Sequence, residues 1–278
     1  MVEGKVSSTS ISQRHNVVPS NLQQYFIVVR YELLKYLRSR RLMAMLIILA
    51  LIIGLILGIP PALGDGYPSD ALEFAQLFGT FVSILAMLCF TFFGADAIVS
   101  EFQQKTGYIL FPNPLNRSVI LMGKFTASIL SAMLIIMLYY GATMGAIGAI
   151  NRSLPKEIVL SFLFCLIYLF AGMAVAFLFS SLMKSAALAY VLVFFFFFLI
   201  MDIINVMFMA AGVAPWASLT FSSGIIVYIL SVPYPTTVDA GPFNIFIPEI
   251  GLSLLVMLFY LVIALLITYF IFEKKEMK

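Results

Sequence analysis

Long hydrophobic runs alternate with shorter polar segments along the chain, and six of these runs are long enough to cross a membrane as helices. A hydrocarbon core about 30 Å thick needs about 20 helical residues. The pattern therefore predicts an all-α integral membrane protein with a transmembrane domain over residues 42–272. The first span is expected to stop at Pro60 and Pro61, because proline disrupts a helix interior. The six expected spans are residues 42–59, 76–99, 119–150, 158–183, 185–213 and 250–272.

An amphipathic connecting helix is expected over residues 20–41. Ser20 and Gln23 fit a capping box, in which each side chain satisfies a backbone amide of the other residue. Apolar residues then recur at three- and four-residue spacing and form one stripe at about 100° per residue. A basic helix of this kind that leads into a span is expected to lie in the cytosolic headgroup layer; an ordinary soluble helix is the alternative. The stripe consists of Leu22, Phe26, Val29, Leu33 and Leu37.

Residues 214–249 form the expected external loop before the last span. Within it, residues 216–232 are uncharged and apolar, and prolines bracket them. A seventh span here would place the Lys-rich tail at residues 273–278 outside the cell, against the charge distribution. We therefore expect a re-entrant or interfacial helical segment, broken near Gly224.

The basic residues indicate the orientation of the chain. Only Arg152 and Lys156, among 16 Lys and Arg residues, fall on the side opposite the two termini. Because basic residues concentrate on the cytosolic side of a membrane, both termini are expected to be cytosolic, including a flexible tail at residues 1–19. Composition agrees, since 63% of residues are hydrophobic and 10% charged, against about a quarter charged in soluble domains.

Few residues could carry chemistry. His15 is the only histidine and lies in the polar tail, while Cys89 and Cys165 lie inside apolar runs. These positions argue against zinc sites, haem ligation and nucleophilic catalysis within the membrane. No GxxxxGK[ST] element for nucleotide phosphates occurs in the sequence, so ATP would have to bind another chain. We expect no catalytic residue, cofactor or metal on this chain, and no nucleic-acid partner.

The longest polar interruption on the cytosolic side is residues 100–118. Gly107 fits a helix stop, because glycine adopts the left-handed cap without steric cost. Pro112 and Pro114 force a turn, and Asn116 can cap the helix that follows.

This segment carries a specific motif. Its spacing resembles that of the ABC-2 type ABC transporter permeases, and the layout of six spans extends the resemblance over essentially the whole chain. The sequence departs from the family in having Gly107-Tyr108 in place of Gly-Thr and in adding Pro112-Asn113. The residues that carry the resemblance are Glu101, Lys105, Thr106, Gly107, Pro114, Leu115, Asn116, Arg117, Leu121, Gly123 and Lys124.

The resemblance implies a permease subunit of an ATP-driven exporter in the plasma membrane. Two such chains, as a homodimer or heterodimer surrounded by lipid, would pair with ATP-binding subunits that hold ATP and Mg. Residues 100–118 would form a coupling loop that docks on the ATPase; for Glu101 and Arg117, solvated interfacial charges are the alternative. The residues implied in coupling are Glu101, Gly107, Pro114, Arg117 and Lys124.

Two acidic residues lie within spans. Asp202 is near the middle of the fifth span, with Asn205 on the same face, and a carboxylate there costs about 2.5 to 3.5 kcal/mol on insertion scales. A place on the substrate path and an interhelical hydrogen bond are both open for this pair. Asp96 is expected at the cytosolic interface as a solvated charge.

Two other classes of function compete. An ATP-independent ion-coupled carrier or a membrane assembly protein is the main alternative, although the halves show no inverted repeat of the kind many carriers have. An intramembrane enzyme is third, because the side-chain constellations that it needs are missing. The substrate and the direction of transport do not follow from the sequence.

Overall fold

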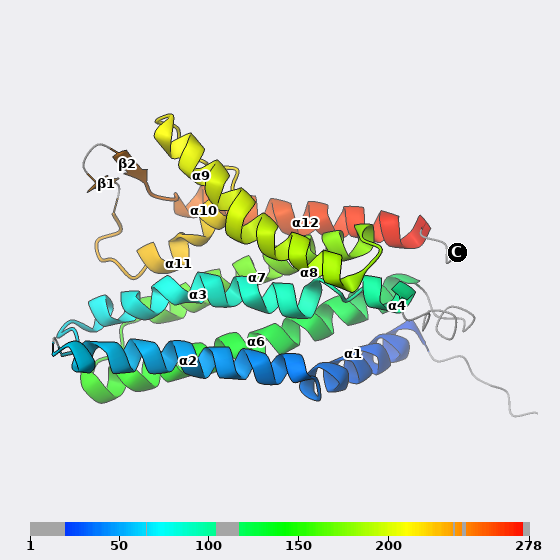
Figure 1. The fold of residues 1–278 in the computed structure, drawn as a ribbon, viewed down its shortest axis with the longest axis horizontal. Helices are drawn as coiled ribbons and strands as arrows, with labels where there is room; N and C mark the ends of the chain where they lie inside the picture. The colour runs from blue at the N-terminus through cyan, green and yellow to red at the C-terminus, as the bar shows by residue number, and fades with distance from the viewer. Residues whose placement is uncertain (1–19, 65, 104–116, 236, 241–242, 275–278) are drawn as a thin grey trace, which may run out of the picture.

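The computed structural model describes residues 20–64, 66–103, 117–235, 237–240 and 243–274. Six helices or helix stacks in this part of the chain are long and apolar enough to cross a membrane, so the predicted all-α, six-span class is confirmed. They lie side by side in an elongated bundle (Figure 1). The six are α2 (Arg40–Leu63), α3 (Ala71–Gly94) continued by α4 (Val99–Gln103), α6 (Arg117–Ile150), α7 (Glu157–Leu182), α8 (Ala186–Phe195) continued by the π-helix η1 (Phe196–Ile200) and α9 (Met201–Ala210), and α12 (Ile250–Lys274).

The core lies between α3, α6 and α7. Each of these helices buries more than half of its apolar span, whereas α2, α8–α9 and α12 each bury less than a quarter. Gly172 on α7 shows how closely the inner helices approach, because a Cβ there would lie 2.3 Å from the Phe90 ring on α3. The three outer helices therefore leave their apolar faces to lipid or to another chain.

Helix α1 (Asn21–Leu37) precedes the first span and begins with the capping box that the sequence predicts, between Ser20 and Gln23. It packs against α6, where a Cβ at Gly123 would lie 2.6 Å from a methyl carbon of Val28. Leu22 and Phe26 of its apolar stripe remain exposed, as expected of a helix that meets lipid headgroups. In Figure 1, α1 lies at the end of the bundle that also holds α4 and the end of α12.

The expectation that the first span stops at Pro60 and Pro61 is wrong. Helix α2 contains both prolines and ends at Leu63, where Gly64 takes a left-handed cap with φ 84°. Pro61 has no N–H to donate to the carbonyl of Leu57 four residues earlier. The hydroxyl of Tyr67 donates to that carbonyl instead, at 2.7 Å, so the helix continues for one more turn.

The segment before the last span contains the expected helical pair, whereas its re-entrant or interfacial position on the external side stays a prediction. Short helices α10 (Leu219–Ser223) and α11 (Ile225–Tyr228) break at Gly224, and neither is long enough to cross a membrane. A two-stranded antiparallel hairpin, β1 (Thr237–Ala240) and β2 (Phe243–Phe246), comes between them and α12. Hairpin and helix pair lie at the end of the bundle opposite α1 (Figure 1).

Candidate functional site

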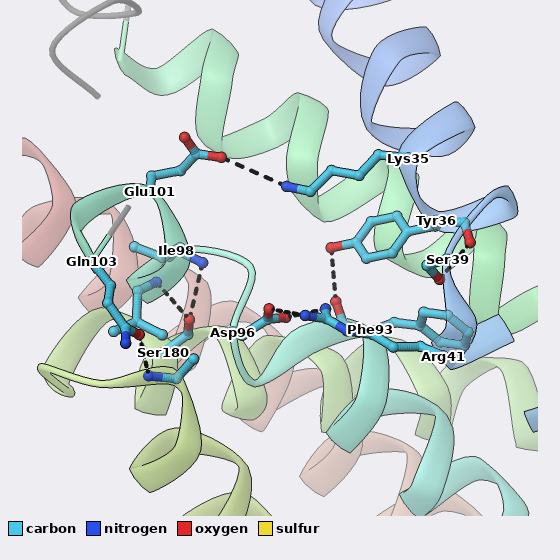
Figure 2. A network of polar contacts seen from close by, with 12 residues as sticks. Lys35, Tyr36, Ser39, Arg41, Phe93, Asp96, Ile98, Glu101, Gln103 and Ser180 are labelled. Carbon is cyan, nitrogen blue, oxygen red and sulfur yellow. Dashed lines mark hydrogen bonds and ion pairs between the residues drawn. The ribbon is translucent and has the colours of Figure 1, made fainter. Parts of the chain in front are cut away.

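The turn between α3 and α4, residues 95–98, is a meeting point of several helices, and we call it the α3–α4 turn (Figure 2). Its Asp96 is buried and accepts two hydrogen bonds from the Arg41 guanidinium of α2, at 2.7 and 2.6 Å. The same guanidinium lies 5.5 Å from the ring centroid of Tyr190 on α8. A bidentate pair of this kind is among the stronger charge contacts in proteins. The expectation that Asp96 is a solvated charge is therefore wrong.

The backbone of the α3–α4 turn is held by α7. The amides of Ile98 and Val99 both donate to the Ser180 hydroxyl, at 3.0 and 3.1 Å. The single Ser180 hydroxyl oxygen can accept both hydrogen bonds because it has two lone pairs. On the following α4, the Gln103 side-chain oxygen accepts from the amide of Ala186, at the start of α8, at 2.9 Å.

Helix α1 reaches the same region through Tyr36, which is buried. Its hydroxyl donates to the carbonyl of Phe93 on α3, at 3.0 Å, and lies 3.0 Å from the Ser128 hydroxyl on α6. Burial raises the pKa of the Tyr36 phenol well above its usual range, so the hydroxyl keeps its proton. Since the Phe93 carbonyl can only accept, Tyr36 donates to it, and Ser128 is left to donate to Tyr36.

A second group of charges lies beside this turn, and we call Glu32, Lys35, Glu101 and Lys124 the Lys124 cluster. The Lys124 side chain is only 3% exposed and donates to Glu101, at 2.7 Å, and to Glu32. Lys35 is 54% exposed and lies 3.4 Å from Glu32 and 3.8 Å from Glu101. A buried charge is tolerated where partners of opposite sign surround it. The two carboxylates and two ammonium groups of the cluster therefore neutralise each other, and their contacts join α1, α4 and α6.

The residues on either side of 104–116 are both attached to the bundle. Glu101 precedes this segment and belongs to the Lys124 cluster. Arg117 follows it and donates to the backbone carbonyl of Glu273, near the end of α12, at 2.7 Å. The described residues before this segment are thus joined to α1 and α6, and the residue after it is joined to α12.

Of the five predicted coupling residues, Arg117 makes the contact with Glu273 described above, and the other four fall into two groups. Gly107 and Pro114 lie outside the described residues. Glu101 and Lys124 are brought together as a buried ion pair, so Glu101 is not the solvated charge that was one alternative for it. Whether these residues act in coupling stays a prediction.

Asp202 and Asn205 form a separate polar group on α9, away from the α3–α4 turn. The Asn205 amide donates to the Thr220 hydroxyl of α10, at 2.8 Å. This contact gives Asn205 an interhelical role between α9 and α10. The Asp202 side chain is nevertheless exposed on the surface of the single chain.

Sequence reasoning missed Glu32, Tyr36, Arg41 and Ser180. A usable signal existed for Arg41, because it and Asp96 have opposite charges at the ends of consecutive spans that the topology places on one side. Glu32 precedes Lys35 by three residues, which suggests only a local helix pair. Tyr36 and Ser180 carry no pattern that separates them from other residues of their helices.

Within the described ranges, no group of three or more His, Cys, Asp and Glu side chains could hold a metal ion.

A family model described as "ABC-2 family transporter protein" matches residues 26–277. No curated protein gives a significant match. The matched range includes most of α1, every span and both groups of charges described above.

Proposed function

The chain belongs to the ABC-2 family of transporter proteins, and we propose that it is the permease subunit of an ATP-driven exporter whose ATP-binding subunit is a separate chain. Six apolar helices make it a multi-pass membrane protein. The sequence contains no phosphate-binding GxxxxGK[ST] element, so a partner would have to supply ATP binding with Mg. We place the complex in the plasma membrane, with both termini in the cytosol.

The observation that carries this proposal is the attachment to the bundle of Glu101 and Arg117, which lie on either side of residues 104–116 in the sequence. A force on this segment reaches α1 and α6 through Glu101 and α12 through Arg117. It also reaches α7 and α8 through α4 and the α3–α4 turn. A partner that grips this one segment would therefore act on most of the bundle.

ATP can shift the bundle only if its binding favours one arrangement of the helices over another. In the proposed mechanism, closure of two ATP-binding subunits moves the coupling loops of two permease chains together. The polar contacts at the α3–α4 turn and in the Lys124 cluster convert this movement into a displacement of α1, α2 and α8 relative to the inner helices. Gly107 and Pro114 would shape the part of the loop that docks.

Asp202 supports pairing of two permease chains and a role on the substrate path. Its carboxylate is exposed on the single chain, yet it lies within an apolar span. Facing lipid would cost about 2.5 to 3.5 kcal/mol. A second permease chain or a polar translocation pathway along α9, shared with Asn205, would remove that cost.

The test is purification of the chain from its native membranes in a mild detergent, scored for a co-purifying P-loop ATPase. The ATPase activity of the complex is then compared with that of the isolated ATPase subunit. We expect Arg117→Ala to weaken the effect of the permease on ATP hydrolysis, because the loop loses its contact with α12. Arg30→Ala is the matched control, because Arg30 is an exposed arginine on α1.

A permease that purifies without any ATPase, under conditions that preserve known complexes of this kind, contradicts the proposal. So does an ATPase whose activity is the same with and without the permease.

A further inference from the structure

A pocket of about 400 Å³ opens at the end of the bundle opposite α1. It lies where the connection before α10 meets the start of α12, and its volume is typical of sites for small molecules. Neither the coupling region nor the Asp202 group contributes to it. Its lining residues are Trp216, Tyr234, Pro235, Ile247, Pro248, Glu249, Ile250 and Gly251.

Two aromatic side chains of the pocket are fixed in place. The Trp216 ring packs edge-on against Phe221, with centroids 5.7 Å apart and planes at 87°, and the residue remains 37% exposed. The Tyr234 hydroxyl donates to the carbonyl of Pro248, also in the pocket wall. Because its hydroxyl is engaged, Tyr234 contributes mainly its ring.

The third feature is the carboxylate of Glu249. Its backbone carbonyl accepts from the amide of Ser253 at the start of α12, but its carboxylate has no hydrogen bond or ion pair with any described residue. The positive end of a helix amounts to about half an elementary charge, so one full carboxylate leaves the pocket negative. No Lys or Arg is among the lining residues.

We propose that this pocket binds a substituted ammonium group, carried by a free amine or by a lipid headgroup. Trp and Tyr rings attract organic cations through the negative faces of their π-systems, and Glu249 supplies the opposite charge. An anion would be repelled by Glu249, and a purely apolar ligand would desolvate the carboxylate without a partner. The proposal does not depend on the transport function.

Trp216 is the only tryptophan of the chain, so intrinsic tryptophan fluorescence reports on this pocket alone. The protein is purified in a maltoside detergent, which carries no ammonium group, and is titrated with choline. We expect a saturable change in fluorescence. The neutral isostere 3,3-dimethyl-1-butanol, which replaces the quaternary nitrogen by carbon, should leave the signal nearly unchanged.

Glu249→Gln keeps the shape of the pocket and removes its charge. We expect it to weaken choline binding roughly fivefold or more, since a carboxylate about 4 Å from a cation contributes about 1 kcal/mol even at the dielectric constant of water. Glu73→Gln is the matched control, because Glu73 is an exposed acidic residue in the first turn of α3. It should bind choline as the unmodified protein does.

Nanodiscs distinguish the two sources of the cation. If a lipid headgroup occupies the pocket, phosphatidylcholine nanodiscs should weaken the apparent affinity for choline, and phosphatidylglycerol nanodiscs should not. Equal affinity in both identifies a free amine. The proposal is overturned by an equal response to the neutral isostere, by unchanged binding in a folded Glu249→Gln variant, or by no saturable binding in fluorescence and calorimetry.

Discussion

Replacing Lys124 by methionine tests the Lys124 cluster most directly. Methionine keeps most of the length of the side chain and its apolar stem but removes the charge. Glu32 and Glu101, which are 14% and 10% exposed, would then face each other, and Lys35, which is half exposed, would be the remaining cation of the cluster. The variant therefore isolates the contribution of the buried cation.

Breaking a buried ion pair by removing one partner costs about 3 to 5 kcal/mol. We expect a value near the lower end, about 3 kcal/mol, because Lys35 still screens both carboxylates and water reaches them in part. For a chain of this size, about 3 kcal/mol corresponds to a fall in Tm of roughly 6 to 12 °C. Helix α1 should also detach more readily, since the cluster holds it against α6.

Thermal unfolding in detergent, with size-exclusion chromatography to measure the fraction that stays folded at each temperature, gives the fall in Tm. Limited trypsin digestion measures the release of α1, which offers a cleavage site at Arg30 and has another at Arg38, directly after its end. Lys184→Met is the control, because Lys184 is exposed and its ammonium has no described partner. Equal melting and equal digestion of the Lys124 and Lys184 variants would refute the assignment of a stabilising role to the cluster.

Substitutions at Gly123, Arg41 and Asp202 test three further contacts. Gly123→Ala should destabilise the protein by about 1 to 3 kcal/mol, because its Cβ would lie 2.6 Å from Val28, whereas Gly145→Ala has open space and should melt no lower than wild type. Arg41→Lys should recover less than half of the stability lost in Arg41→Ala, because an ammonium cannot form the bidentate contact; thermal melts of both variants check this. Asp202→Asn should slow transport in reconstituted vesicles if Asp202 lines the substrate path, and an unchanged rate with unchanged melting would leave it only an interhelical contact.

The sequence predicts most of the fold because a membrane restricts it so strongly. Spanning segments must be helical, long and apolar, so hydropathy locates all six. The break at Gly224 and the capping box at Ser20 are equally local features. The end of α2 could not be predicted in the same way, because Tyr67 replaces the hydrogen bond that Pro61 cannot make.

The candidate site was predictable only in part. The resemblance to the ABC-2 permeases pointed to Glu101 and Lys124, but it could not supply their partner Glu32, which is 92 residues away from Lys124 in the sequence. Asp96 was misjudged because its closeness to Glu101 in the sequence suggested the cytosolic interface, whereas Arg41 binds it and Tyr190 packs against the Arg41 guanidinium. Contacts between distant helices depend on how the helices pack. The periodicity of each helix shows which face is apolar, but it does not show which residues of two helices meet.

Stability alone does not explain why charges are kept beside the coupling loop. Well-packed apolar side chains often stabilise a protein as much as a buried ion pair does, or more. Lys124→Met combined with Glu32→Gln and Glu101→Gln should therefore regain most of the lost Tm, because the only cluster charge left is that of Lys35, which is 54% exposed and therefore hydrated. An ion pair, however, forms only at a defined geometry, so its energy differs strongly between two arrangements of the helices. Apolar contacts depend less on geometry and distinguish the two arrangements less. If the cluster serves coupling, the triple variant will be stable and will bind the ATPase, yet it will no longer alter ATP hydrolysis; if the charges only hold the fold, both properties will return together.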